Sequence, residues 1–361
     1  MDSLSVFCNS CGRVMENPLE YRCTCGGVFK IEIKEAFKRS EDKVVTLERY
    51  RPNFPYIRSI VSLGEQSTPL VKLNGNVMLK LDYMNPTGSF KDRGSATLVS
   101  AVKSYGKDIT ELREDSSGNA GASLAAYSAR AGYRCHVFVP HTASGAKLEQ
   151  IKAYGAKLTV VKGSRAQVGE KAQDVSAGGI YVGHSWHPYF RDGMRTLAYE
   201  ISEQTKLDEL DYVFCPVSAG TLFLGIVSGF RHLLESGVVK RMPKIIACQT
   251  SKVSPFYHAL KGTHYRAPSQ VSSVADALVS TKPPLLELMV NEAKSVGADA
   301  EAVEERYIVA AWKELALHGF FVEPSSAVAY AAYKQYSKRK DASESSTVIV
   351  LTGSGLKRPT I

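Results

Sequence analysis

Short apolar runs alternate with amphipathic stretches along most of the chain. The runs have the length and β-branched content of buried strands, and six stand out: "VMLKLDY", "CHVFVP", "KLTVVKG", "DYVFCPV", "KIIACQT" and "STVIVLT". Between them lie helical patterns that end in glycine, "SATLVSAVKSYG", "AGASLAAYSARAG" and "SGAKLEQIKAYG", and further helices are expected from Thr221 and twice within residues 284–318. This alternation predicts parallel sheets covered by helices on both faces, with active sites in the loops after the strands.

The overall composition indicates a globular protein without a membrane span or a nucleic-acid surface. Hydrophobic residues make up 44% of the 361 positions and charged residues 22%, which is ordinary for a soluble protein. The formal net charge of +9 is spread along the chain, and no apolar run reaches the roughly twenty residues that a bilayer requires. The first residues lack the layout of a signal peptide, so we expect a cytoplasmic protein.

Seven cysteines divide into a cluster of four near the start and three single ones in apolar runs, which we interpret as core thiols. The cluster has the spacing C-x2-C-x11-C-x-C with a glycine after each pair, which suits tetrahedral zinc; its members are Cys8, Cys11, Cys23 and Cys25. Because four thiolates leave no open position, such a zinc would be structural. A disulfide or four unrelated thiols remain as alternatives, and a cytoplasmic setting disfavours the disulfide.

One lysine stands in an unusual sequence, "NPTGSFKDRGS" at residues 85–95. The Pro/Gly turn leads out through Ser89, so Lys91 is expected at the start of a helix. The helix dipole at that end disfavours a positive charge, so the amine loses its proton more readily. A neutral amine is what Schiff-base chemistry needs, whereas a surface lysine, the alternative, requires no such placement.

Three further loops carry small and polar residues. "SSGNAGAS" at residues 116–123 precedes a helix and predicts a site for a carboxylate or a phosphate, although an ordinary helix cap explains part of it. "PVSAGTLFLG" at residues 216–225 opens a helix at a small-residue turn, as a phosphate cradle does. "VLTGSGLK" at residues 350–357 follows the last strand, and taken alone it indicates only a glycine turn.

Together, "NPTGSFKDRG", "SSGNAG" and "TGSGLK", in this order, resemble the threonine synthases of the pyridoxal-phosphate fold type II group. The resemblance runs from the cysteine cluster to the last strand. It implies an α/β fold with two parallel-sheet domains of the tryptophan synthase β-like architecture and a small N-terminal zinc-ribbon-like knot. We expect the knot and a connector at residues 1–45, a large cofactor-binding domain at residues 46–85 plus 186–361, and a smaller mobile domain at residues 86–185.

The resemblance also assigns roles to individual residues. Lys91 would bind pyridoxal phosphate as a Schiff base and then shuttle protons, Asn119 would bond the 3′-oxygen of the ring, and Thr352 would face the pyridine nitrogen. The loop that would cradle the cofactor phosphate consists of Val217, Ser218, Ala219, Gly220 and Thr221. A hydroxyl partner leaves the ring nitrogen less protonated than a carboxylate would.

The implied reaction converts O-phospho-L-homoserine and water into L-threonine and phosphate, by γ-elimination followed by β-addition of water. The substrate is a small phosphorylated amino acid, and we expect a homodimer with neither nucleic acid nor a membrane as a partner. A phosphate beside a carboxylate needs a second anion site. The candidates are the turn with Ser116 and Ser117 and the loop "HSWHPYFRDGMR" with Ser185 and Arg191.

Three motifs depart from the family pattern, and one of them is the loop "VSAGT", which has fewer Gly and Asn residues than is common in the family. "GEQSTPL" stands where the family has "GEGxTPL", and His187 replaces the asparagine of "N-P-x-x-x-E-G-x-K-T". Because of the changed loop at residues 184–195, related enzymes with shorter substrates remain as alternatives: an O-phosphoserine sulfhydrylase, a cysteate synthase or a serine/threonine ammonia-lyase. A binding protein that has lost catalysis is the alternative from another class, and the intact Lys91 and Asn119 argue against it.

Overall fold

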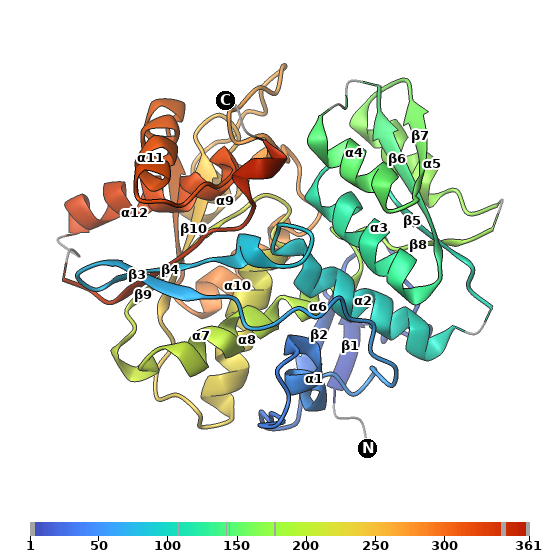
Figure 1. Cartoon of the computed structure of the whole chain (residues 1–361), viewed down its shortest axis with the longest axis horizontal. Coiled ribbons are helices and arrows are strands. Elements are labelled where there is room, and N and C mark those ends of the chain that lie inside the picture. The colour runs from blue at the N-terminus through green and yellow to red at the C-terminus, as the bar shows by residue number, and fades with distance from the viewer. Residues whose placement is uncertain are drawn as a thin grey trace. The chain divides into compact units, whose positions relative to one another are not determined.

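The chain folds into two units, each built around a sheet that is wholly or mostly parallel (Figure 1). The computed structural model describes residues 4–106, 108–141, 143, 145–176, 178–340 and 344–358. By their contacts, unit 1 consists of Met1–Ser67 and Asn85–Gly193, and unit 2 of Thr68–Met84 and Met194–Ile361. The predicted α/β class with parallel sheets is therefore confirmed.

Unit 1 contains a four-stranded parallel sheet in the order β7-β6-β5-β8. Its strands are β5 (Glu111–Glu114), β6 (Arg134–Pro140), β7 (Lys157–Val161) and β8 (Ile180–Tyr181). Its longer helices are α2 (Lys91–Tyr105), α3 (Asn119–Ala131), α4 (Ala146–Ala153), α5 (Arg165–Gln173) and α6 (Pro188–Gly193). Because β5 and β8 are parallel neighbours, the segments that follow them begin at the same edge of the sheet.

The N-terminal part of unit 1 is an antiparallel pair of strands, β1 (Leu4–Cys8) and β2 (Phe29–Ile33), and residues 4–33 are termed the ribbon below. Two backbone bonds close tight turns in it, from Gly12 N to Cys8 O (2.9 Å) and from Gly26 N to Cys23 O (2.8 Å). Both turns fall at the glycines that follow the cysteine pairs. The short helix α1 (Thr46–Tyr50) and the 3-10 helix η1 (Arg51–Asn53) come after the ribbon.

Unit 2 contains a six-stranded sheet in the order β11-β10-β9-β12-β4-β3, parallel except for the β3–β4 pair. Its strands are β3 (Leu70–Asn74), β4 (Val77–Lys80), β9 (Tyr212–Pro216), β10 (Lys244–Thr250), β11 (Asp299–Val303) and β12 (Thr347–Val350). Its helices are α7 (Arg195–Gln204), α8 (Thr221–Glu235), α9 (Pro255–Lys261), α10 (Leu286–Ser295), α11 (Glu305–Leu317) and α12 (Pro324–Lys340). Short 3-10 helices lie at η2 (Asp82–Met84), η3 (Leu207–Glu209), η4 (Asp276–Leu278) and η5 (Gly355–Lys357).

The core of unit 2 forms where α12 packs on the sheet. Alanines and Val328 of α12 share one apolar cluster with Phe214, Ile246 and Ile349 from three adjoining strands. This burial of apolar surface fixes the carboxyl ends of the strands relative to one another. Among the described residues, no helix is both long enough and apolar enough to cross a membrane.

Most of the predicted elements are confirmed. Helix α2 ends before Gly106, and α3 ends before Gly132, whose positive φ of 80° is the left-handed helix stop that glycine favours. Helix α8 begins at Thr221 as predicted. Strand β11 separates the two helices within residues 284–318 and is absent from the prediction, because "DAEAV" is not an apolar run. Helix α12 is also absent, because its first half is buried all round and shows no polar stripe.

The division into units differs from the predicted domain limits in three places. Residues 46–67, Asn85 and residues 186–193, which are expected in the large domain, belong to unit 1. Tyr56 joins the first and the last of these segments: its hydroxyl donates to Asp192 Oδ2 (2.6 Å), and its ring stacks on that of Tyr189 with centroids 4.0 Å apart. The three-part domain organisation itself stays a prediction.

Candidate active site

Lys91 is the first residue of α2, and its neighbour Asp92 fixes the turn that leads to it. One carboxylate oxygen of Asp92 accepts from Thr87 N (2.7 Å), and the other accepts from the hydroxyls of Thr87 (2.6 Å) and Ser123 (2.6 Å). Asp92 is fully buried, so water does not compete for these bonds. They hold the turn and helix α3 against the start of α2, and this fixes the backbone position of Lys91.

The side chain of Lys91 lies against aromatic rings of unit 1. Its Nζ is 4.6 Å from the ring centroid of Phe90 and 5.9 Å from that of Phe190. The side chain is half-buried, at the start of a helix of 15 residues. A helix dipole and partial burial both disfavour the protonated amine, so this position suits a lysine that must react in its neutral form.

The turn "SSGN" connects β5 to α3 and packs tightly on the first turn of that helix. A Cβ atom at Gly121 would collide with the carbonyl of Ser116, so only glycine lets the turn fold back this far. Ser116 Oγ accepts a bond from Gly118 N (3.3 Å). The N-cap of α3 is Gly118, which has no side chain for capping, and Asn119 is the first helical residue. An ordinary side-chain cap therefore does not explain this string, and the helix start suits an anion.

A chain of polar contacts links β5 to the segment that follows β8. Glu114, the last residue of β5, accepts from His184 N at Oε2 (3.0 Å), and its Oε1 lies 3.2 Å from His184 Nδ1. His184 Nε2 lies 3.2 Å from Ser185 Oγ. Burial, followed by the positive charge of Lys91, lowers the pKa of His184 well below its usual value, whereas burial raises the pKa of Glu114. Lys91 and the loop with Ser185 are thus electrostatic neighbours within unit 1.

Arg191 and His187, from the end of the same segment, are buried among structural partners. Arg191 Nη2 donates to the backbone carbonyl of Phe29 in β2. His187 is buried, and its Nδ1 accepts from Tyr189 N (3.3 Å). Burial, followed by the charge of Arg191, lowers the pKa of His187 to about 3. His187 is therefore neutral and adds no positive charge for an anion.

The ribbon contacts this segment at two further points. The rings of Tyr21 and Tyr181 meet edge to face with centroids 4.7 Å apart, and the Tyr21 hydroxyl donates to Gln173 Oε1 (3.1 Å). The guanidinium of Arg22 lies 5.3 Å from the ring centroid of Trp186. With the bond from Arg191, the ribbon contacts residues 181, 186 and 191, on both sides of His184 and Ser185.

The four cysteines of the ribbon lie together, as their spacing predicts. The sulfurs of Cys8, Cys11, Cys23 and Cys25 are all within 4.8 Å of one another. Arg13 Nε donates to Cys23 Sγ (3.3 Å), and this bond lowers the pKa of Cys23 to about 6. Such a thiolate is the form that binds a metal, so the donor set fits a tetrahedral zinc ion.

In unit 2, residues 217–221 form the turn from β9 into α8. Val217 N donates to Cys248 O (2.8 Å), and this bond ties the turn to the neighbouring strand β10. Gly220 has a φ of 97°, and a Cβ atom there would collide with the sulfur of Met289, so a side chain does not fit. Intrahelical bonding begins with Leu224 N to Gly220 O (3.0 Å). The N–H groups before it have no intrahelical acceptor, which makes the turn suitable for a phosphate.

Thr352 follows β12, the strand beside β9, and is held by Ser326 of α12. The two hydroxyl oxygens lie 3.0 Å apart, and Ser326 Oγ also accepts from Thr352 N (3.0 Å) and Gly353 N (2.8 Å). Both residues are buried. The strings "EPSS" and "TGSG" therefore form one polar corner, in which Ser326 orients the Thr352 hydroxyl.

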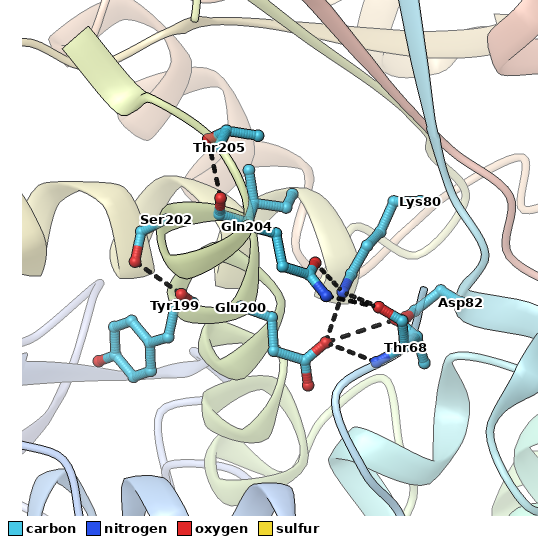
Figure 2. A network of polar contacts seen from close by, with 9 residues as sticks. Thr68, Lys80, Asp82, Tyr199, Glu200, Ser202, Gln204 and Thr205 are labelled. Atoms are coloured by element: carbon cyan, nitrogen blue, oxygen red, sulfur yellow. Dashed lines mark hydrogen bonds and ion pairs between the residues drawn. The ribbon is translucent and has the colours of Figure 1, made fainter. Parts of the chain in front are cut away.

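Lys80, the last residue of β4, is a buried lysine, and it donates hydrogen bonds to three residues of unit 2 (Figure 2). Its Nζ donates to Thr68 O (2.7 Å), Glu200 Oε2 (2.6 Å) and Gln204 Oε1 (2.8 Å), and the side chain is fully buried. All three donor positions of the ammonium group have an acceptor, one of which is a carboxylate. This arrangement makes Lys80 a structural residue and leaves Lys91 as the better candidate for amine chemistry.

Each unit brings part of the predicted site together. Unit 1 gathers Lys91, the turn with Ser116 and Ser117, and Ser185, whereas unit 2 gathers the 217–221 turn and Thr352 at adjoining strands. The sequence assigns no role to Asp92, Glu114 or Ser326, which hold these residues in place. A carboxylate directly after Lys91 and a serine in "VEPSSA" are signals from which two of the three could have been found.

Comparison with known proteins identifies relatives along most of the chain. Residues 61–353 match the family model described as pyridoxal-phosphate dependent enzyme. The chain is similar to the threonine synthase of Methanocaldococcus jannaschii, with 33% identity over 98% of this chain and 92% of that protein. It is also similar to the threonine synthase of Methanosarcina acetivorans, with 29% identity and the same coverage of 98% and 92%.

Solved structures share the fold at lower sequence identity. Maize serine racemase superposes with a TM-score of 0.67 at 22% identity, over 81% of this chain and 90% of that one. The processed form of threonine deaminase isoform 2 from Solanum lycopersicum gives 0.68 at 21% identity, over 80% and 84%. At this identity the similarity supports a common fold type and says nothing about the substrate.

Proposed function

We propose that this chain, which belongs to the family of pyridoxal-phosphate-dependent enzymes, converts O-phospho-L-homoserine and water into L-threonine and phosphate. The observation that carries the proposal is the similarity to a threonine synthase, with 33% identity over 98% of the chain. The enzyme is a carbon–oxygen lyase, and its reaction is γ-elimination of phosphate followed by addition of water at the β-carbon.

The residues present fit the cofactor in both units. We assign Lys91 and Asn119 of unit 1 and the 217–221 turn and Thr352 of unit 2 to its binding. The turn has a glycine where a side chain does not fit, and it offers backbone N–H groups for a phosphate. When bound, pyridoxal phosphate supplies an electron sink for negative charge that develops on the substrate carbons.

The side chains of this chain then hold and move protons. The Lys91 amine, positioned by Asp92, takes a proton from substrate carbon and returns one, because a neutral amine at a helix start is a base of suitable strength. The Thr352 hydroxyl, oriented by Ser326, offers the ring nitrogen a partner without a negative charge. The aromatic rings of Phe90 and Phe190 beside Lys91 limit access of water to the amine.

We assign the substrate anions to Ser116 and Ser117 in the "SSGN" turn and to Ser185 and Arg191. The α3 helix start and the half-buried Ser185 support the first three. For Arg191, the bond to Phe29 O supports a structural role beside any contact with substrate, since Nη2 already has an acceptor. The substrate that requires all four residues is a phosphorylated amino acid.

Further features of the protein are proposals of the same kind. The sulfur cluster supports one structural zinc per chain, held by the four ribbon cysteines in a zinc-ribbon-like knot. The cytoplasmic setting stays a prediction of the sequence. A homodimer, without nucleic acid or a membrane as partner, stays a prediction that sedimentation of the purified protein tests.

A substrate panel tests the proposed function. Purified protein with added pyridoxal phosphate is assayed for phosphate and threonine release from O-phospho-L-homoserine, for sulfide-dependent turnover of O-phospho-L-serine, and for ammonia release from serine and threonine. We expect threonine and phosphate in equal amounts. Turnover of only the shorter substrates would contradict the proposal and move the enzyme to a sulfhydrylase or an ammonia-lyase.

A further inference from the structure

Glu114, His184 and Ser185 form a polar chain from the interior of unit 1 toward its surface. The Glu114 side chain is 1% exposed and that of His184 13%, whereas Ser185 is half-buried. We propose that Glu114 and His184 are positioning residues that decide whether the Ser185 hydroxyl donates or accepts a hydrogen bond, and thereby whether the site takes a phosphate. This rests on the proposed function, in which Ser185 contacts the substrate.

The His184 ring has defined partners on each side. Its own backbone N–H donates to Glu114 Oε2 (3.0 Å) while Nδ1 lies 3.2 Å from Oε1 of the same carboxyl. On its other side, the ring meets Phe190 nearly edge to face, with centroids 5.7 Å apart. Nε2 is therefore directed at Ser185 Oγ, at 3.2 Å.

A neutral imidazole has one ring proton, so it donates to only one of its two neighbours. If Glu114 is ionised, the proton sits on Nδ1 facing the carboxylate, and Nε2 accepts from the Ser185 hydroxyl. Ser185 then presents only lone pairs to a ligand. If Glu114 is protonated, its O–H donates to Nδ1, the imidazole proton sits on Nε2 facing Ser185, and the serine O–H is released to donate.

A phosphate dianion carries no protons, so it needs the state in which Ser185 donates. Binding of the phosphate then takes up one proton from solvent, which resides on Glu114, while the imidazole proton changes from Nδ1 to Nε2. A ligand that offers a hydroxyl or ammonium proton instead selects the other state without proton uptake. Glu114 and His184 thus act on substrate choice without touching the substrate.

Other charged groups face the chain from neighbouring elements. Asp115 accepts from the Tyr181 hydroxyl (2.8 Å) and pairs with Arg165 Nη2 of α5 (2.8 Å), and Lys91 faces His184 from α2. Asp115 N donates to Glu114 Oε1 (3.0 Å). Burial raises the pKa of Glu114, which supports proton uptake by this carboxyl when an anion binds, while burial and the charge of Glu114 raise the pKa of Asp115.

The test compares the holoenzyme with its Glu114→Gln, Ser185→Ala and Ser185→Thr variants across a pH series. Calorimetric titration with inorganic phosphate in buffers of different ionisation enthalpy measures proton uptake, and kinetics with O-phospho-L-homoserine measure KM and kcat. We expect the wild type to take up one proton more than Glu114→Gln when phosphate binds. The ratio of the wild-type KM to the KM of Glu114→Gln should then rise by up to about tenfold for each unit of increasing pH. Titration of the substrate phosphate itself cancels in this ratio.

The serine variants keep the test decisive if Glu114→Gln folds poorly. Ser185→Ala should bind phosphate weakly at every pH without extra proton uptake, and Ser185→Thr should restore both. The exposed Glu170→Gln on α5 serves as the matched control and should behave as the wild type. Equal proton uptake in the wild type and Glu114→Gln would overturn the inference. Phosphate binding with proton uptake, but no threonine formation, would support the inference and refute the proposed function.

Discussion

Lys80 Nζ lies 2.6 Å from Glu200 Oε2 inside unit 2, and both side chains are fully buried. The same carboxylate oxygen accepts from Thr68 N (3.1 Å), and the Thr68 hydroxyl donates to Asp82 Oδ1 (2.9 Å). The pair therefore joins the end of β4 and helix α7 to the residues that precede β3 (Figure 2). An ion pair of this kind contributes little net free energy when intact, but the loss of one partner leaves a buried charge uncompensated.

Glu200→Ala is expected to lower the free energy of unfolding by about 3–5 kcal/mol, because Lys80 keeps its charge in an apolar interior. Chemical denaturation followed by circular dichroism measures the change. The exposed pair of Lys206 and Glu209, with 83% and 68% of the side-chain surface accessible, provides a matched control. Glu209→Ala should leave the unfolding midpoint unchanged. Equal midpoints for the wild type and Glu200→Ala would show that the buried pair has no structural role.

Lys91→Ala is expected to abolish turnover and the visible absorbance of the bound cofactor together, because no other amine can take its place at the start of α2. Borohydride reduction of the wild type followed by peptide mapping should place the cofactor on Lys91. The exposed Lys152→Ala on α4 is the control and should retain both signals. Cofactor found on Lys80 or another lysine would overturn the assignment.

About one zinc per chain is expected in protein purified without added metal. Replacing Cys8 and Cys11 together with serine should remove the zinc and lower the thermal unfolding midpoint before it lowers kcat, because a structural metal contributes folding free energy. Cys135→Ala, which changes a buried thiol outside the ribbon, should keep the metal. Elemental analysis decides: zinc that persists in the double variant would rule out this site.

Arg191→Lys is expected to raise KM for O-phospho-L-homoserine while cofactor binding stays unchanged, because lysine cannot reproduce the paired hydrogen bonds of a guanidinium. The bond to Phe29 O adds a second effect, a lower unfolding midpoint. Steady-state kinetics and thermal unfolding on the same preparation separate the two. If the midpoint falls and KM does not change, Arg191 is a structural residue. Unchanged turnover of serine or threonine by Arg191→Ala would support an ammonia-lyase.

The sequence predicts those parts of the site that depend on local structure. Lys91 lies at a helix start directly after a Pro/Gly turn, and the 217–221 turn of small residues leads into another helix. Both features can be recognised from neighbouring residues in the sequence. The pairing of Glu114 with His184 depends on β5 and β8 being neighbours, which no local pattern reveals. Lys80 in the middle of "VMLKLDY" shows that a buried charge needs a partner, but the partner lies 120 positions away.

The same limit explains why the environment of Arg191 is not predicted. Its place in a phosphate-like string suggests a ligand contact, whereas Phe29, the residue that accepts its bond, is 162 positions earlier in the chain. The sequence shows the type of each side chain and the residues next to it along the chain. Which carbonyl or carboxylate lies opposite is decided by the packing of distant elements.

The contacts of the ribbon with residues 181, 186 and 191 have a practical consequence for protein engineering. A shortened protein that begins after residue 33 would keep every residue assigned to the cofactor, yet Tyr181, Trp186 and Arg191 would lose their contacts with the ribbon. Such a protein should therefore retain its visible colour and still discriminate poorly among amino-acid ligands. In this chain the ribbon therefore acts as a support on both sides of the loop that we propose to contact the substrate.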